Sequence, residues 1–413
     1  MFEFLNRVKH ILFFLYSSFF MSVLTFGQGY TSISGKILDS QTKKPVAGVY
    51  LEIPPKGAWT NTLGTLSDEK GGFLLKFPSI LLTTGILKTS KVGYQSGEQE
   101  LVKVKDQKDS LVLFVQTVPR VRFDSLDGYR LVSDAIDRME ASFPINPYWL
   151  TGFYRETLRF DDTLVKITEG VLKIEKTPLP EKDGVGELIK LLKGRRYEKD
   201  ERVDEWESLD FANPATLVTR SLETKLPDFL EPALLRGYHF LVEPFLTHLD
   251  GNPVYSVRFL PKDERRVKGG KTGKMLIDTL SLGIVSLEYE FTTEGLKDVM
   301  KAVMMGSGKF ITEMKSFTVT QRYHQTQGRY YLEDAHLGVI LANRTSKKLI
   351  PAVINLDFYA TEVNSRLTTH LRDNELIEDT LFPLGGVSYL DTFWGNYNFI
   401  KLEERLKSFF TKK

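Results

Sequence analysis

Residues 33–94 decide the fold of the first domain: they contain ISGKILDSQTKKPVAGVYLEI (33–53), GTLSDEKGGFLLKFP (64–78) and KTSKVGYQS (88–96). Short apolar runs alternate there with Gly, Pro, Asp and Ser, a pattern typical of a small antiparallel β-sandwich. Phe73, Leu75 and Phe77 occupy every second position, so we expect them on a buried strand face. With further strands at 32–38, 49–53, 86–91 and 111–115, the pattern predicts a sandwich of about seven strands over residues 29–118.

This stretch resembles the carboxypeptidase regulatory-like domain, a transthyretin-like β-sandwich. The matched residues are Gly35, Asp39, Pro45, Gly48, Val49, Gly64, Thr65, Asp68, Gly72, Phe73, Gly93 and Tyr94. The resemblance implies a binding and stability module without chemistry of its own, found at the front of envelope proteins in double-membraned bacteria. The insert at 54–63, which contains Trp59, departs from the family pattern.

Composition limits the function classes. The chain has 55 Lys and Arg residues and 53 Asp and Glu residues, so it lacks the excess of positive charge with which proteins bind nucleic acid. The chain has no Cys, which excludes disulfides and thiol catalysis. Its 413 residues suggest two or three domains, each able to bury a core.

The N-terminus predicts export. Arg7, Lys9 and His10 precede the apolar run 11–26, and Thr25 and Gly27 are small residues suited to cleavage before Gln28. An uncleaved anchor is the competing interpretation, but the run is shorter than the roughly 20 residues that a spanning helix needs. We therefore expect residues 1–27 to be a signal peptide, and the mature chain to lack a transmembrane helix. The expected location is the periplasm, the outer membrane or the cell surface.

After a linker at 119–128, residues 129–413 predict an α+β domain built on a large, curved antiparallel sheet. A helix is expected at 129–143, a hairpin at 149–160 and 164–174, and short helices at 185–192, 215–222 and 403–410. Strands are expected at 238–249, 254–260, 273–278, 283–291, 317–324, 330–341 and 352–361.

Two further resemblances concern this second domain. Segments FYRE (153–156), GKMLID (273–278) and FWGNYN (393–398) resemble landmarks of an uncharacterised domain that follows the same sandwich in other exported proteins. Residues 273–291 also resemble the repeated hairpin of periplasmic lipoprotein-carrier proteins, which implies a curved sheet around an apolar ligand.

The candidate binding residues fall in two places. Tyr154, Arg155 and Glu156 lie on an expected strand, where Arg155 and Glu156 point to opposite faces; an ion pair across the sheet is the simpler interpretation. Trp394 and Tyr397 belong to an aromatic segment that either pins the C-terminus to the sheet or stacks on a glycan.

No catalytic or metal-ligating residue is assigned, and no cofactor is expected. The six histidines do not form a zinc-peptidase motif. Gly270-Lys271-Thr272 lacks the earlier glycine of a phosphate loop, and Ser388 lacks a complete nucleophile elbow. The basic residues at 262–274 and the acidic stretch 198–210 are interpreted as solvated surface. For the basic residues, contact with anionic lipid is the more specific alternative.

The leading hypothesis is a non-enzymatic exported envelope protein that binds a protein, polysaccharide or lipid. The alternative is a periplasmic lipid or lipoprotein carrier that uses a concave sheet, which requires an apolar cavity. A hydrolase centred near Arg155 and Glu156 comes third, and it requires converging polar groups in a pocket.

We predict that N-terminal sequencing of the exported protein finds a mature chain that begins at Gln28, because the small residues before it suit signal peptidase. A mature chain that still carries Phe2 and the apolar run would contradict cleavage.

Overall fold

The computed structural model describes residues 29–57, 59–104, 111–161, 163–178, 188–199, 217–218, 221–306, 311–344, 349–366, 370, 389–403, 406 and 409–410. The expected signal peptide, most of the acidic stretch, Ser388 and half of the residues in each of the expected helices at 215–222 and 403–410 lie outside these residues. The chain is mainly β, with large antiparallel sheets and a few helices.

The first domain is a seven-stranded β-sandwich, which confirms the predicted fold class. Its strands are β1 (Tyr30–Asp39), β2 (Tyr50–Ile53), β3 (Thr62–Leu66), β4 (Gly72–Pro78), β5 (Ile86–Ser90), β6 (Gly97–Glu100) and β7 (Leu111–Val115). One sheet has the order β4-β1-β7 and the other runs β6-β5-β2-β3. Phe73, Leu75 and Phe77 are all buried in the core between them, as their spacing predicts.

A tight turn before β4 shows why the sequence folds this way. The Asp68 carboxylate accepts hydrogen bonds from the backbone N–H groups of Lys70 and Gly72, at 2.9 and 2.7 Å. Gly71 has a φ of 71°, and a Cβ there would lie 2.4 Å from the Ile37 carbonyl oxygen. Only glycine fits both the backbone conformation and this close approach.

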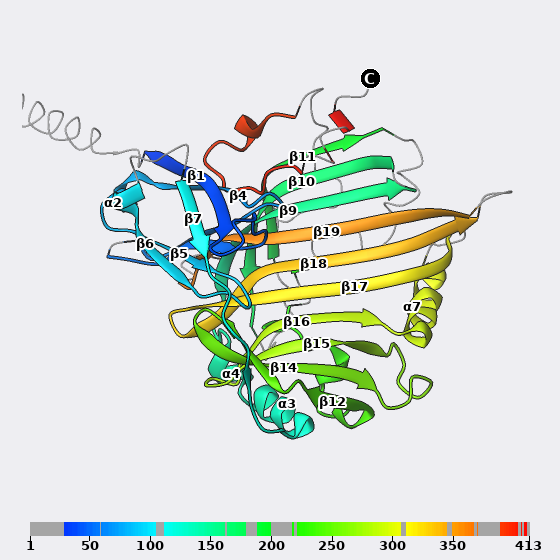
Figure 1. Ribbon diagram of the computed structural model, residues 1–413. Helices are drawn as coiled ribbons and strands as arrows, with labels where there is room; N and C mark the ends of the chain where they lie inside the picture. The colour runs from blue at the N-terminus through cyan, green and yellow to red at the C-terminus, as the bar shows by residue number, and fades with distance from the viewer. Residues whose placement is uncertain are drawn as a thin grey trace, which may run out of the picture.

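The second domain is a large antiparallel sheet whose strands cross the view in Figure 1. Its strands are β8 (Val121–Arg122), β9 (Tyr148–Phe160), β10 (Thr163–Lys176), β11 (Leu188–Glu198), β12 (Tyr238–Val242), β13 (Phe245–Leu249), β14 (Asn252–Pro261), β15 (Lys271–Asp278), β16 (Ile284–Phe291), β17 (Ile311–Thr326), β18 (Arg329–Arg344) and β19 (Leu349–Asn364). The order runs β8-β13-β14-β15-β16-β17-β18-β19-β9-β10-β11, and β12 also pairs with β14.

Helices flank this sheet. They are α3 (Gly128–Asp137), α4 (Met139–Ser142) and α7 (Thr293–Gly306), while α2 (Leu101–Val104) belongs to the sandwich. The predicted helix at 129–143 is therefore two helices, and α7 was not predicted. The Thr292 hydroxyl accepts a hydrogen bond from the Gly295 N–H at 3.1 Å and caps α7. Leu296, Val299 and Met300 pack on the core at helical spacing.

One predicted element is wrong. Residues 185–192 were expected to form a helix, but Leu188 begins the strand β11. Ile189 is buried and pairs with Ile174 of β10. Pairing with the edge of β10 therefore makes this segment a strand. A short apolar run takes its secondary structure from its pairing partner more than from its own periodicity.

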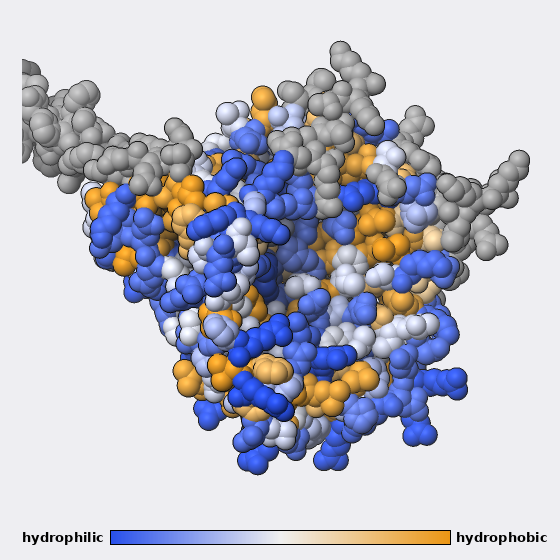
Figure 2. All heavy atoms as spheres, viewed as in Figure 1, coloured by the Kyte–Doolittle hydropathy of each residue, from blue (hydrophilic) through white to orange (hydrophobic). Residues whose placement is uncertain are grey.

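The sheet has two different faces. Leu337, Val339 and Leu356 point to what we call the core face, which the helices and residues 217–218 and 221–235 cover. Arg322, His336 and Asp357 lie on the opposite, outer face. The sandwich and the C-terminal segment (residues 389–403) cover part of that face, and hydrophilic residues line its central hollow in Figure 2.

The two domains share backbone pairing. At the end of β19, Glu362 pairs with Leu63 and Val363 pairs with Thr62 of β3, so the sheet runs on into the sandwich. A hydrophobic cluster fills the angle between the two parts and contains Tyr50, Leu66, Phe153, Val171, Trp394, Phe399 and Ile400. The sandwich, the second sheet and the C-terminal segment therefore bury one another's apolar side chains.

Two titratable side chains meet at this junction. Glu52 of β2 lies opposite His324 of β17, with Oε2 and Nε2 3.7 Å apart, and the Tyr50 ring lies 4.9 Å from the imidazole. Burial raises the pKa of Glu52 to about 8 and lowers the pKa of His324 to about 4. Both groups are therefore neutral near pH 7, which allows them to lie in a buried junction.

We predict that Trp394→Ala lowers the free energy of unfolding by about 3–5 kcal/mol, because the indole is fully buried in the junction cluster. Urea denaturation measures the change. Tyr397→Ala is the control: this ring lies in the same segment but is 36% exposed, and its loss should cost less than about 1 kcal/mol. Equal effects of the two variants would contradict this role for Trp394.

Candidate functional site

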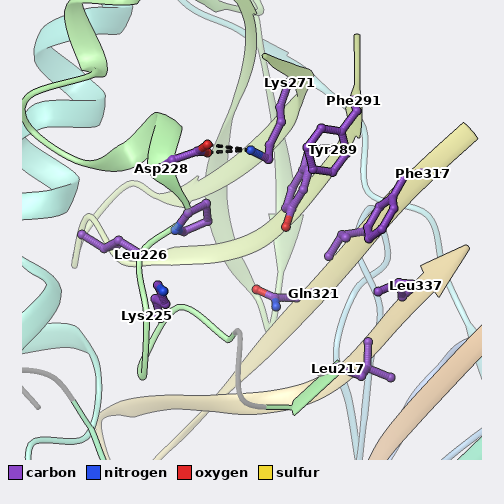
Figure 3. Close-up of a pocket in the computed structure, with 12 residues that line it drawn as sticks. Leu217, Lys225, Leu226, Asp228, Lys271, Tyr289, Phe291, Phe317, Gln321 and Leu337 are labelled. Atoms are coloured by element: carbon purple, nitrogen blue, oxygen red, sulfur yellow. Dashed lines mark hydrogen bonds and ion pairs between the residues drawn. The ribbon is translucent and has the colours of Figure 1, made fainter. Parts of the chain in front are cut away.

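A cavity of about 300 Å³ lies between the core face of the sheet and the segment that covers it. Tyr289 and Phe291 of β16, Phe317 and Val319 of β17, and Leu337 of β18 form the sheet side. Leu217, Leu226 and Pro227 also line it, and Figure 3 shows Leu226 across the cavity from Phe317 and Leu337. Most of this lining is apolar, which is typical of ligand sites that hold a hydrocarbon group.

One end of the cavity is charged. The Lys271 ammonium group lies 2.7 and 2.8 Å from the two carboxylate oxygens of Asp228 and donates a hydrogen bond to the Gly269 carbonyl oxygen at 3.1 Å (Figure 3). Lys225, an exposed residue, and Gln321 also line the cavity. The site can thus hold an apolar chain and place a polar or anionic group against lysine.

Buried polar contacts attach the covering segment to the sheet. Lys176, at the end of β10, donates to the Ser221 hydroxyl at 2.6 Å and to the Val218 carbonyl oxygen at 2.7 Å. Glu223 lies 3.4 Å from the same ammonium group and accepts a hydrogen bond from the Tyr148 hydroxyl at 3.1 Å. Because Lys176 is buried and contacts Val218, Ser221 and Glu223, it attaches the covering segment to the sheet.

Tyr154, Arg155 and Glu156 do not form one site. On the core face, Glu156 accepts a hydrogen bond from the Tyr154 hydroxyl at 3.0 Å and pairs with Lys166 at 3.2 Å. Arg155 lies on the outer face and pairs with Glu169 of β10 at 2.8 Å. The structure therefore places Arg155 and Glu156 on opposite faces, each in its own cross-strand ion pair.

The Arg155 pair belongs to a buried cluster that sequence reasoning missed. Arg195 of β11 donates to the same Glu169 carboxylate at 2.9 Å, and Tyr389 donates to it at 3.0 Å. Arg155 also donates to the Ile400 carbonyl oxygen at 2.7 Å, and Arg195 donates to that of Leu390 at 3.1 Å. This cluster fastens the C-terminal segment to the outer face. Glu169 lies directly opposite Arg155, and only the register between β9 and β10 shows this.

Trp394 and Tyr397 have different environments. Trp394 is fully buried, packs edge-on against Phe153 at 5.2 Å and lies 4.9 Å from the Arg195 guanidinium. Tyr397 is partly exposed and lines a separate pocket. The structure thus separates the two aromatic residues into a packing role and an accessible one.

The basic residues expected at 262–274 lie mostly at the surface. Between β14 and β15, Lys262, Arg265, Arg266 and Lys268 are exposed, whereas Lys271 turns toward the cavity. Within the described residues, no three His, Asp or Glu side chains are placed to hold a metal ion. Among the same residues, no helix is long and apolar enough to span a membrane.

A charged network lies on the outer face. His336 of β18 contacts Asp334 through Nε2 and Asp357 through Nδ1, both at 2.7 Å, and Arg322 donates to Asp334 at 2.7 Å. Burial alone would lower the pKa of His336, but these two hydrogen-bonded carboxylates outweigh it and raise the pKa to about 9. The imidazole is thus protonated at neutral pH and links β18 to β19.

No family model and no curated protein matches this chain. Among solved structures, it is similar to a Vibrio parahaemolyticus domain described as outer membrane lipoprotein-sorting, at 10% identity over 60% of this chain and 94% of that one, with a TM-score of 0.30. A lipovitellin structure matches at 9% identity over 55% and 26%, with a TM-score of 0.24. A Bacteroides fragilis protein described as membrane-associated matches at 8% identity over 80% and 97%, with a TM-score of 0.15. These similarities are too weak to assign a family.

We predict that the charged network makes the protein less stable as pH rises from about 6.5 through 9. The pKa of His336 is higher in the folded than in the unfolded state, so its contribution is complete below pH 6.5 and lost above pH 9. Urea unfolding of wild type and His336→Gln should show the wild type losing about 1–2 kcal/mol more over this range, allowing for partial exposure of the ring. Parallel pH profiles would contradict the role of His336.

Proposed function

We propose that this protein is an exported, non-enzymatic carrier or binding protein for an amphiphile with an apolar chain. The observation that supports this best is the cavity on the core face, whose walls are mostly apolar and whose one end holds Lys271 and Asp228. A ligand with an acyl-like chain and a polar head would match this arrangement. The chain would replace apolar contacts along β16–β18, and the head would remain beside Lys271.

The geometry favours this proposal over the hydrolase near Arg155 and Glu156. The two side chains lie on opposite faces, and both are engaged in buried ion pairs. The described residues that line the apolar cavity include no serine or histidine that could act as nucleophile or base. A site that binds its ligand without reacting with it therefore agrees better with these residues than a hydrolase site does.

The sandwich fits the same proposal as an accessory module. We infer from the matched residues in 29–118 that it is a carboxypeptidase regulatory-like domain of an envelope protein, placed by export outside the cytoplasm. Its extensive contact with the second sheet suggests that it stabilises the carrier domain.

The test is binding of cis-parinaric acid, a fluorescent fatty acid, to the purified protein. Leu337→Trp adds volume on the cavity wall and should weaken binding at least tenfold, because the larger ring occupies the space of the chain. Native mass spectrometry of protein purified from its own envelope should also show a retained amphiphile.

Ile340→Trp is the matched control, because Ile340 lies on the same strand with its side chain on the outer face. It should bind parinaric acid as the wild type does, and urea midpoints must show that both variants are folded. Absence of wild-type binding, or equal binding by Leu337→Trp and wild type, would refute the proposed carrier function.

A further inference from the structure

A second pocket, of about 240 Å³, opens on the outer face, remote from the apolar cavity. Its floor comes from adjacent strands: Glu362 and Asn364 of β19, Trp149 and Thr151 of β9, Lys173 of β10 and Leu192 of β11. Tyr397 of the C-terminal segment forms a wall. The pocket thus exists only because the C-terminal segment is fastened across these strands.

The polar groups in the floor form a cross-strand row. Thr151 pairs with Glu362 on one side and with Lys173 on the other, so the three side chains share one face of the sheet. They provide a carboxylate acceptor, a hydroxyl that both donates and accepts, and an ammonium donor. One acid and one base leave the row without net charge, which disfavours a strongly ionic ligand.

Several of these groups retain hydrogen-bonding capacity. Glu362 uses Oε1 to accept a hydrogen bond from the Asn61 amide. Burial raises the pKa of Glu362, while Asn61 and the nearby Lys173 oppose the rise. Asn364 accepts from the Arg366 N–H at 2.9 Å through its carbonyl oxygen, and its amide nitrogen stays available among the described residues. The Tyr397 hydroxyl makes no hydrogen bond within the described part of the chain.

Aromatic surface lies beside this polar row. Tyr397 is 36% exposed, and the Trp149 ring lines the pocket with the Lys173 ammonium group 4.1 Å from its centroid. The pocket therefore sets flat apolar surface next to mixed donors and acceptors. A sugar ring has the matching chemistry, because its hydroxyls donate and accept while its C–H faces are apolar.

We propose that this pocket binds a neutral saccharide ring. Tyr397 stacks on the C–H face of the ring, while Glu362, Thr151 and Lys173 hydrogen-bond its hydroxyls. An acyl chain would leave these polar groups buried and unpaired, so this pocket and the apolar cavity select different ligands. The proposal does not depend on the proposed carrier function.

The experiment is saturation-transfer NMR of the full chain with glucose, galactose, mannose and N-acetylglucosamine. We expect a signal from at least one of these sugars. The dissociation constant of the bound sugar should rise at least tenfold in Tyr397→Ala and in Glu362→Gln. Cellohexaose and chitohexaose distinguish the source: tighter binding of an oligomer indicates a polysaccharide, and equal binding indicates a free sugar.

Tyr129→Ala, which removes another exposed tyrosine on α3, and Leu337→Trp should both bind the sugar as the wild type does. Urea midpoints show whether each variant is folded. If the wild type binds none of the four sugars, the proposal is wrong. It is also wrong if folded Tyr397→Ala and Glu362→Gln both bind normally. A wild type that binds a sugar but not parinaric acid would refute the carrier function alone.

Discussion

The pairing of β3 with β19 is the constraint on which the rest of this structure depends. It joins the sandwich to the second sheet through backbone hydrogen bonding, so the two parts meet at a fixed register. The cluster around Tyr50, Phe153 and Trp394 then fills the angle between them. Because packed side chains tolerate little displacement, this junction also positions the C-terminal segment and the pocket beside Tyr397.

Buried charges attach the irregular segments to both faces of the sheet. On the outer face, Glu169 with Arg155 and Arg195 holds the C-terminal segment; on the core face, Lys176 with Glu223 holds the cover of the apolar cavity. A buried ion pair adds little net stability compared with an apolar contact, but loss of one partner costs several kcal/mol. Such pairs therefore specify where a segment lies.

The sequence predicted the regular parts of the fold because the periodicity of apolar residues is local. The alternation through Phe73, Leu75 and Phe77 identified β4, and the strands from β14 to β19 were all predicted, although β17 begins six residues before its predicted start. The helix expected at 185–192 failed because the edge of β10 recruits this segment as β11. No helix was predicted at α7, although the sequence contains its signals: Thr292 as a cap, and Leu296, Val299 and Met300 at helical spacing.

The sequence by itself determined a seven-stranded sandwich followed by a large antiparallel sheet, and it put Arg155 and Glu156 on opposite faces. Strand alternation and turn residues act over a few positions, so a single chain segment carries that information. Only the tertiary structure decided that Glu169 joins Arg155 to Arg195, that Trp394 is buried while Tyr397 is accessible, and that cavities lie on both faces. These features depend on strand register and on contacts between residues hundreds of positions apart, such as Arg155 and Ile400, which no local pattern encodes.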